Sequence, residues 1–384
     1  MSKTRGFSLI CIILIGQFLL LVHYNNFNYA ENTKSIEEKP VIFEEQSSFQ
    51  AIKSTINQTI QQFPLLTSGM ILPSELGNDC GFSSDVLYTA QWGGARGDVT
   101  FKLDSNDNFI VTGGFGGQIT LGTFTLTSVG ACDFFIAKID SNGTWLWALS
   151  AGSFLGSING YFDFITDIEI NSNDDIYISG VMGSFYTNYT MDLGGIILQG
   201  SSFVAKINAT GSVLWANSMI NARATSLSIT STNEVFVTGI QDHTAYFGSI
   251  ESSITGWYGD IFFVSKVNAN GFWEWVTTPD NGSGHKATSI AVDSNDNAVI
   301  SIYFSSGTAN LDFGNNNFFP HGTYEGASLV AKIDNNGNWL WVDVISNYTF
   351  PIALDINSND EIIVTGGFSH NLTLPNQIIN TTGD

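Results

Sequence analysis

The sequence is poor in cysteine, in basic residues and in proline, and the composition excludes several classes of protein. Its 384 residues include only 3 cysteines, too few for a disulfide-dense scaffold or a zinc cluster. It has 13 basic residues against 35 acidic ones, a formal charge of -22, so no basic stripe could hold a nucleic-acid backbone. Proline occurs 7 times, whereas 39 Gly and 29 Phe make the chain far too aromatic for a disordered one. We therefore expect a folded, acidic protein without a nucleic-acid partner.

The usual sequence signatures of catalysis are missing as well. Neither Gly-x-Ser-x-Gly nor His-Glu-x-x-His occurs. The segment Gly113–Gly117 is similar to a phosphate-binding loop, but it ends a predicted strand and opens no helix. Four histidines lie beyond the first thirty residues, at unrelated places: His243, His285, His321 and His370. We predict no catalytic residue, no cofactor-binding residue and no cofactor.

Residues 1–30 are predicted to be a signal peptide or a signal anchor. Lys3 and Arg5 precede an apolar run from Phe7 to Val22, and Ala30 offers a small residue at which cleavage could occur. The run is 16 residues long, shorter than the ~20 that a spanning helix needs, which favours cleavage. Asn28 fits a cleavage site poorly, so anchoring remains the alternative. Either way we predict a secreted or cell-surface protein, with a membrane contact only if the segment stays uncleaved.

An oxidising compartment would permit one disulfide bond and N-glycosylation. Cys11 lies inside the apolar run, so the candidate bridge joins Cys80 to Cys132; two unpaired cysteines are the alternative. Eight Asn-x-Ser/Thr sequons are candidate glycosylation sites: Asn57, Asn142, Asn188, Asn208, Asn281, Asn347, Asn371 and Asn380.

Residues 31–84 are predicted to form a linker that contains one short amphipathic helix, at about 48–63. Five apolar residues recur there at steps of 3, 4, 4 and 3 before Pro64: Phe49, Ile52, Ile56, Ile60 and Phe63. A helix that covers the edge of the following domain fits this pattern. A short coiled-coil or partner-binding helix is the alternative.

Residues 85–384 are built from two segments that alternate and recur. One segment ends in a tryptophan and appears at Phe134–Trp147, Phe203–Trp215, Phe262–Trp275 and Leu329–Trp341. The other joins two apolar strands through a turn of Asp, Asn and Ser, at Val99–Gly113, Ile168–Gly180, Leu227–Gly239, Ile290–Ile302 and Leu354–Gly366. Each pair of segments supplies two hairpins and therefore four strands, A to D. The sequence thus predicts an all-β protein, a β-propeller of four-stranded blades.

The number of blades has two interpretations. Four units are complete, Leu87–Trp92 resembles a lone D strand, and Ala353–Gly366 supplies an A–B hairpin whose C strand does not follow. In the first interpretation, the lone D strand closes a five-bladed ring. In the second, which we favour, the chain is part of a longer ring or array, because an open sheet edge is a liability.

The recurring segments resemble the SBBP class of β-propeller repeat. Its units pair an A–B hairpin that ends in Thr-Gly with a strand that reads Phe-Val-Ala-Lys-Ile-Asp, and the resemblance covers about residues 86–384. It implies the architecture and an extracytoplasmic setting, but no common activity. A lesser similarity to quinoprotein propellers is set aside, because Asp140 falls one place late and the adjacent cysteine pair is absent.

The turns and the tryptophans supply the candidate site residues. Four A–B turn aspartates could bind a cation, namely Asp107, Asp174, Asp296 and Asp360. The turns lack the bidentate Glu of a calcium loop, so hydrogen-bonded turns explain them better and we predict no metal site. The repeated Trp147, Trp215, Trp275 and Trp341 could stack on sugars, but their fixed place in each unit favours blade packing.

We therefore expect a binding or structural module that contacts an extracellular protein or carbohydrate through its inter-blade loops. The alternative is an extracellular hydrolase or lyase that acts on polysaccharide through carboxylates converging at the channel mouth. A non-functional truncated product is a third interpretation.

Overall fold

The computed structural model describes residues 9–15, 18–24, 100–130, 132–153, 162–183, 189–254, 261–279, 284–304, 311–313, 318–319, 326–346, 349–368, 371–374 and 377–380. The chain divides into two compact units, Met1–Gly69 and Met70–Asp384. All the repeats belong to the second unit. The predicted helix at about 48–63, the lone D strand Leu87–Trp92 and Cys80 lie outside the described residues.

In the first unit, the apolar run forms two antiparallel strands, β1 (Leu9–Ile15) and β2 (Phe18–Tyr24). This hairpin does not test cleavage or anchoring, so the signal segment stays a prediction. Across the described part of the chain, no helix has the length and apolar character to cross a membrane.

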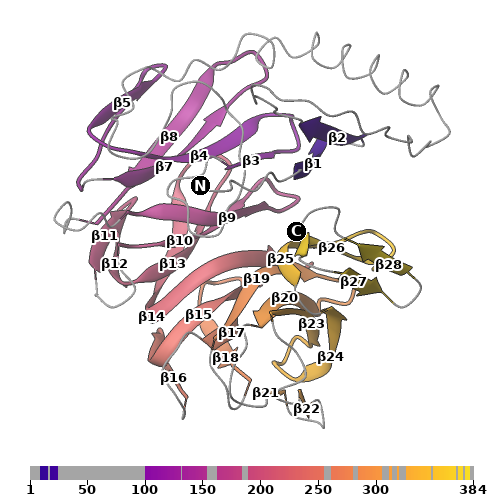
Figure 1. Cartoon of the computed structure of the whole chain (residues 1–384). Helices are drawn as coiled ribbons and strands as arrows, with labels where there is room; N and C mark the ends of the chain where they lie inside the picture. Colours follow the sequence, from indigo (N-terminus) through magenta and orange to yellow (C-terminus); the bar gives the residue numbers. More distant parts are fainter. Residues whose placement is uncertain are drawn as a thin grey trace, which may run out of the picture. The chain divides into compact units, whose positions relative to one another are not determined.

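The second unit is all-β in its described part, and its strands pair in the order that the repeats predict. Blade 1 is the antiparallel sheet β3–β4–β7–β8, with bounds Thr100–Leu103, Phe109–Phe115, Asp133–Ile139 and Trp145–Ala151. Blade 4 is β19–β20–β23–β24, with bounds His285–Val292, Ala298–Phe304, Ala327–Ile333 and Trp339–Ser346. Figure 1 follows these sheets along the chain.

Blades 2 and 3 share one long strand, β14 (Val213–Ile229). Its first half is strand D of blade 2 and pairs with β13; its second half is strand A of blade 3 and pairs with β15. The other strands of blade 2 are β9 (Phe164–Ile170), β10 (Ile176–Val181) and β13 (Ser202–Ile207). Those of blade 3 are β15 (Val235–Phe247), β17 (Ile261–Val267) and β18 (Trp273–Thr277).

Blade 5 has an A–B hairpin, β25 (Thr349–Ile356) and β26 (Ile362–Phe368), and no C or D strand among the described residues. The connections between B and C strands, and the segment that follows β26, carry strands of their own. These are β5 (Gln118–Leu121), β6 (Phe124–Thr127), β11 (Tyr189–Leu193), β12 (Ile196–Gly200), β16 (Ile250–Ser253), β21 (Leu311–Asp312), β22 (Phe318–Phe319), β27 (Asn371–Leu374) and β28 (Gln377–Asn380).

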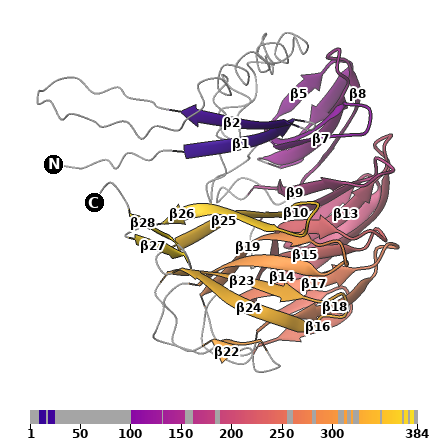
Figure 2. The ribbon, with the colours of Figure 1, turned by 90° about the vertical axis from the view of Figure 1, so that its right-hand side faces the viewer.

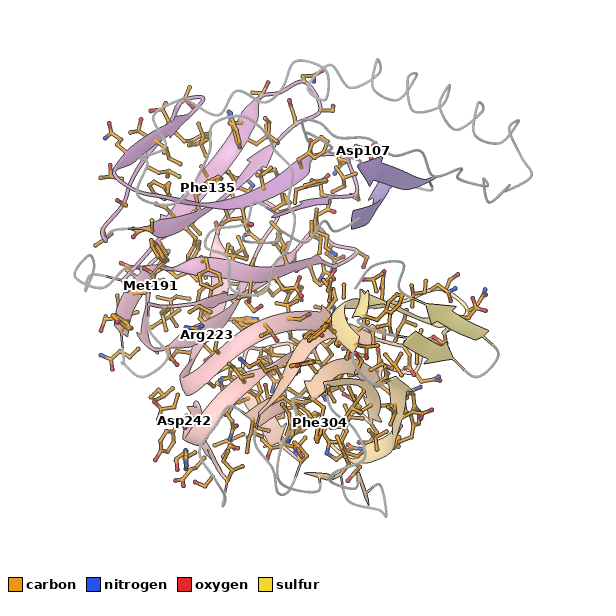
Figure 3. All side chains as sticks on the ribbon, viewed as in Figure 1. Asp107, Phe135, Met191, Arg223, Asp242 and Phe304 are labelled. Atoms are coloured by element: carbon orange, nitrogen blue, oxygen red, sulfur yellow. The ribbon has the colours of Figure 1, made fainter. Side chains whose placement is uncertain are left out.

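The core lies between the sheets of successive blades, which follow one another side by side (Figure 2). The C strands β7 and β17 are buried at every position, so both of their faces are covered. Phe134 of blade 1 stacks on Phe203 of blade 2 with ring centroids 5.4 Å apart. Figure 3 shows the side chains on the ribbon, among them Phe135 of the blade 1 sheet. The C strands do not alternate between apolar and polar residues because neighbouring sheets cover both of their faces.

Candidate functional site

Each A–B turn is a five-residue loop held by its own first residue. In blade 1, Asp104 Oδ1 accepts hydrogen bonds from the backbone N–H groups of Asn106 and Asn108, at 2.8 and 2.9 Å. The fourth residue, Asp107, has a φ of 59°, in the left-handed region that Asp and Asn tolerate best. The fourth residues of the other turns have φ between 59° and 64°. The predicted cation ligands are thus the positions that let each turn close.

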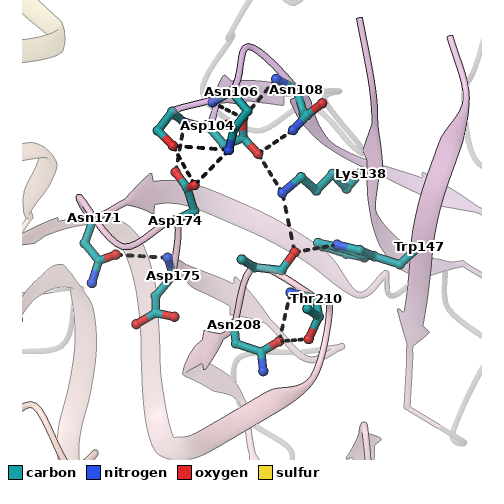
Figure 4. Close-up of polar contacts among 12 residues, drawn as sticks. Asp104, Asn106, Asn108, Lys138, Trp147, Asn171, Asp174, Asp175, Asn208 and Thr210 are labelled. Carbon is teal, nitrogen blue, oxygen red and sulfur yellow. Dashed lines mark hydrogen bonds and ion pairs between the residues drawn. The ribbon is translucent and has the colours of Figure 1, made fainter. Parts of the chain in front are cut away.

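The carboxylates at this fourth position bond to the turn of the preceding blade. Asp174 accepts from the Ser105 backbone N–H at 2.8 Å and from its hydroxyl at 2.7 Å, as Figure 4 shows. Asp296 accepts in the same way from Ser231, at 2.7 and 2.7 Å. We call this arrangement the Asp–Ser clamp.

Blades 4 and 5 are joined by the same clamp, and blades 2 and 3 by a variant of it. Asp360 accepts from the Ser294 N–H and hydroxyl at 2.9 and 2.5 Å. Between blades 2 and 3, Asn233 accepts from the side-chain amide of Asn171 at 2.7 Å. The described side chains include no group of three His, Cys, Asp or Glu residues that could hold a metal ion. The turn carboxylates therefore connect blades.

A lysine in each C strand pairs with an acid in the A–B turn of its own blade. Where the first turn residue is Asp, it takes the lysine: Lys138–Asp104 at 2.6 Å and Lys332–Asp293 at 2.5 Å. Where the first residue is Asn or Thr, the fifth residue takes it: Lys206–Asp175 at 2.8 Å and Lys266–Glu234 at 2.9 Å. The turn that lacks both aspartates thus keeps its ion pair through Glu234.

Three of the four repeated tryptophans, Trp147, Trp215 and Trp275, pack against the C–D turn of the next blade. Trp147 donates from Nε1 to the Ala209 carbonyl at 3.1 Å, and Trp275 donates to that of Asn335 at 3.2 Å. Gly211 has a φ of 87°, and a Cβ there would lie 2.7 Å from the Trp147 ring, so this turn requires glycine. The tryptophan face that could stack on a sugar is occupied by the neighbouring blade.

A charged cluster that the repeat pattern does not predict lies on the A strands of blades 1 and 2. Lys102 of β3 donates to Glu169 of β9 at 2.9 Å, and their side chains are 42% and 31% exposed. Burial works against the charge of Lys102, but Glu169 and Asp167 outweigh it and hold the pKa of Lys102 above its usual value. Burial, with Asp167 and Asp355 adding to it, raises the pKa of Glu169 although Lys102 opposes this.

Asp167, two residues before Glu169, has a structural role in this cluster. It accepts hydrogen bonds from the Ser226 hydroxyl at 2.7 Å and from the Leu227 N–H at 3.0 Å, both in blade 3. Burial nevertheless raises the pKa of Asp167. Lys102, Glu169 and Asp355 occupy the same place in their repeats, two residues before the A–B turn, where blades 3 and 4 have Ser228 and Ala291. A comparison of the charge at this position in each repeat would have identified these three residues.

A second pair of buried acids lies near Cys132, at the junction of blades 1 and 2. Asp163 accepts from the Ser153 N–H and hydroxyl and from the Gly183 N–H, and burial raises the pKa of Asp163 to about 6. Burial also raises the pKa of Asp133. Cys132 is disulfide-bonded, but Cys80 is not described, so the predicted pairing stays a prediction.

The two described histidines, His243 and His285, do not lie together in one site. His243 bonds to Asp242 at 2.8 Å, whereas His285 is buried and stacked on Phe304 at 4.5 Å. Burial lowers the pKa of His285 to about 4. His321 and His370 lie outside the described residues.

Two predicted glycosylation sites have described side chains. Asn142 is exposed in the C–D turn of blade 1, and Asn208 is half-buried in that of blade 2. The Asn208 side chain accepts hydrogen bonds from Thr210 and Ser212, so a glycan there would compete with the turn. Asn371 and Asn380 lie in β27 and β28, and the other four sequons fall outside the described residues.

Comparison with known proteins supports a repeat protein of the propeller type. No family model matches the chain. The chain is similar to an uncharacterized WD repeat-containing protein, L264, of Acanthamoeba polyphaga mimivirus, with 22% identity over 356 residues. That alignment covers 74% of this chain and 25% of the viral protein, so the chain spans about a quarter of that relative's length.

Three solved structures show a distant likeness to the chain. One is a protein of unknown function from Bacteroides caccae, with 13% identity, a TM-score of 0.33, and 64% of this chain and 69% of that chain covered. Another is a protein of unknown function from Dyadobacter fermentans, with 9% identity, a TM-score of 0.39, and coverage of 73% and 78%. The third is the Dos1 propeller, with 9% identity, a TM-score of 0.34, and coverage of 71% and 66%. With scores this low, the fold rests on the chain's own strand pairing.

Proposed function

We propose that this chain is an extracytoplasmic β-propeller of the SBBP type that acts as a binding module. The signal-like first thirty residues, the eight sequons and the disulfide at Cys132 support the compartment. The partner that fits the acidic chain is an extracellular protein or a carbohydrate.

One observation carries this proposal: the two ends of the blades differ. At one end, the five described A–B turns and the four described C–D turns are nearly alike, and the Asp–Ser clamps, their Asn variant and the tryptophans connect neighbouring blades there. The B–C connections at the other end differ in length and sequence, and they include the hairpins β5–β6 and β11–β12. Variable loops on a rigid scaffold are where binding sites commonly lie.

A binding screen tests this proposal. The labelled protein would be applied to a glycan array and to a panel of extracellular proteins, beside a variant in which a short glycine turn replaces the β11–β12 hairpin. A matched control would shorten β5–β6 in the same way. We expect binding without turnover that is lost in one loop variant and kept in the other. Binding that neither loop change affects would contradict the proposal.

The alternative function, a polysaccharide hydrolase or lyase, is favoured by the charged cluster on the A strands. Glu169 and Asp355 are carboxyl groups from different blades, and the raised pKa of Glu169 suits a general acid. Its test is turnover on a polysaccharide panel, with Glu169→Gln expected to abolish activity while Glu251→Gln, an exposed position in β16, leaves it unchanged. Activity that survives Glu169→Gln would exclude this site.

A further inference from the structure

The A–B turn of blade 1 brings an amine and a carboxamide to one carboxylate oxygen. The Asp104 Oδ2 atom lies 2.6 Å from the Lys138 Nζ atom. The same oxygen accepts a hydrogen bond from the Asn108 side-chain amide at 2.9 Å. Figure 4 shows both groups bonded to this carboxylate. Because one oxygen atom holds both nitrogens, the lysine amine and the asparagine carboxamide are neighbours.

These three groups are the ones that an amine–amide exchange requires. In that reaction the Lys138 nitrogen attacks the Asn108 Cγ atom, so that a new C–N bond forms while the Cγ–Nδ2 bond breaks. Lys138 loses two protons, and both leave with the departing nitrogen as ammonium, so atoms and charge balance without an oxidant. Asp104 Oδ2 contacts both nitrogens and can therefore move these protons from one to the other.

Asn108 is the group attacked, because Asp104 is ionised and a carboxylate resists an amine. Burial works against the charge of Asp104, but its hydrogen bonds to Lys138 and Asn108 outweigh it and hold the pKa of Asp104 below its usual value. An ionised Asp104 is a weak base, so the exchange is slow. The side chains of Lys138 and Asp104 are 8% and 1% exposed, so water has little access and the contact lasts as long as the fold.

Blade 4 repeats the arrangement with a longer amide contact. Lys332 Nζ lies 2.5 Å from Asp293 Oδ2. The Asn297 side-chain amide donates to the two oxygens of Asp293 at 3.4 and 3.4 Å. The amine and the amide thus share a carboxylate here too, but the amide is held less closely than in blade 1.

Blades 2 and 3 lack the arrangement and serve as internal controls. In blade 2, Lys206 pairs with Asp175, whereas the amide of Asn171 donates to Asn233 of the next blade. In blade 3, the first and fifth turn residues are Thr and Glu, so no carboxamide stands at either position.

We propose that Lys138 and Asn108 form an intramolecular isopeptide bond, with Asp104 as the proton relay. Lys332 and Asn297 form a second bond in blade 4, more slowly because of the longer contact. Each bond ties the C strand of a blade covalently to its A–B turn. In a chain with 3 cysteines, such bonds supply cross-links that disulfides cannot.

Peptide mapping of the whole purified chain by mass spectrometry tests the proposal. After protease digestion, we expect a branched peptide that joins the Asn108 segment to the Lys138 segment. Its mass should be one ammonia below the sum of the two peptides, and its yield should rise as the folded protein is incubated. Peptides that contain Lys206 and Lys266 should remain unbranched in the same digest.

Two substitutions separate the relay from the nucleophile. Asp104→Asn removes the carboxylate but keeps a turn acceptor, since Asn171 and Asn357 occupy this turn position in blades 2 and 5. It should slow formation of the blade 1 bond by about a hundredfold or more. Lys138→Arg keeps the positive charge and should abolish the bond. The matched control Lys206→Arg should leave it unchanged, and circular dichroism checks that each variant is folded.

Three results would overturn the proposal. One is the absence of the branched peptide from unaltered protein after prolonged incubation. Another is a branch at Lys206 or Lys266 as abundant as that at Lys138, because those lysines do not share a carboxylate with an asparagine amide. The third is a blade 1 bond that forms at an unchanged rate in folded Asp104→Asn.

Discussion

At the scale of single residues, one position of the A–B turn has two structural roles. The fourth residue of each A–B turn adopts a left-handed φ, and in blades 2 to 5 its carboxylate or amide oxygen also accepts a hydrogen bond from the turn of the preceding blade. The composition of the turns was predictable, and so was their closure by side-chain hydrogen bonds. The residues to which Asp174 and Asp296 bond could not be predicted, because they depend on how the sheets of two blades stack, which no local pattern encodes.

The Asp–Ser clamp should contribute measurably to stability. We expect Asp296→Ala to lower the free energy of unfolding by about 1–3 kcal/mol, because it removes two charge-assisted hydrogen bonds and leaves a non-Gly, non-Asx residue at a φ of 59°. Urea denaturation of Asp296→Ala, Ser231→Ala and the double variant gives the coupling energy. Because alanine keeps the backbone N–H that bonds to Asp296, additive effects of the two substitutions would show that the bond from the Ser231 hydroxyl contributes nothing.

Buried His285 should make stability depend on pH. Its pKa is lowered to about 4 in the folded protein against about 6.5 when unfolded, so the unfolded chain binds the proton first. The stabilising effect is therefore complete above pH 6.5 and is lost as the pH falls toward 4, by about 3 kcal/mol. Asp163, with a pKa of about 6, acts in the opposite sense, because its stabilisation is lost as the pH rises from about 4 to 6.

The variant His285→Phe isolates the histidine effect, since Phe can keep the stacking on Phe304. Denaturation curves at pH 7 and pH 4.5 should show a smaller loss of stability on acidification for the variant than for the unaltered protein. Equal losses in both proteins would exclude His285 as a source of the pH dependence.

At the scale of elements, the hairpins were predictable and their ion pairs were not. The alternation of apolar strands and Asx-rich turns predicted the A–B and C–D hairpins within a few residues. The acid that pairs with the C-strand lysine changes between the first and fifth turn positions, from Asp104 to Glu234, and only the strand register shows which one is in reach.

The pair between Lys266 and Glu234 tests this account of the hairpins. Lys266 is buried and pairs with both Glu234 and Glu274, so Lys266→Met should cost about 3 kcal/mol by removing the cation that these two carboxylates share. The double variant with Glu234→Gln should recover much of that loss. Thermal or urea denaturation of the four proteins measures both effects. A double variant no more stable than Lys266→Met would contradict the account.

At the scale of the whole molecule, the repeats allowed the fold class to be predicted from the sequence, whereas the charged cluster on the A strands could not be predicted from them. Five A–B copies and four C–D copies are enough to predict four-stranded units. The cluster comes from differences among the copies: Lys102 of blade 1 forms an ion pair with Glu169 of blade 2, and the charge of Asp355 in blade 5 adds to the raised pKa of Glu169. Such convergence follows from the arrangement of the blades and not from any local pattern.

The most direct test of the central claim, that pairing with a C strand is what buries and protects the B strand of a blade, is amide hydrogen exchange of two identical segments, of which one pairs with a C strand among the described residues and the other does not. Ile110–Phe115 and Ile363–Phe368 have the same sequence, so their intrinsic exchange rates are closely matched and only structure separates them. The account predicts slow exchange in β4, paired on both sides, and exchange at least a hundredfold faster in β26. Equal protection of the two segments would contradict it.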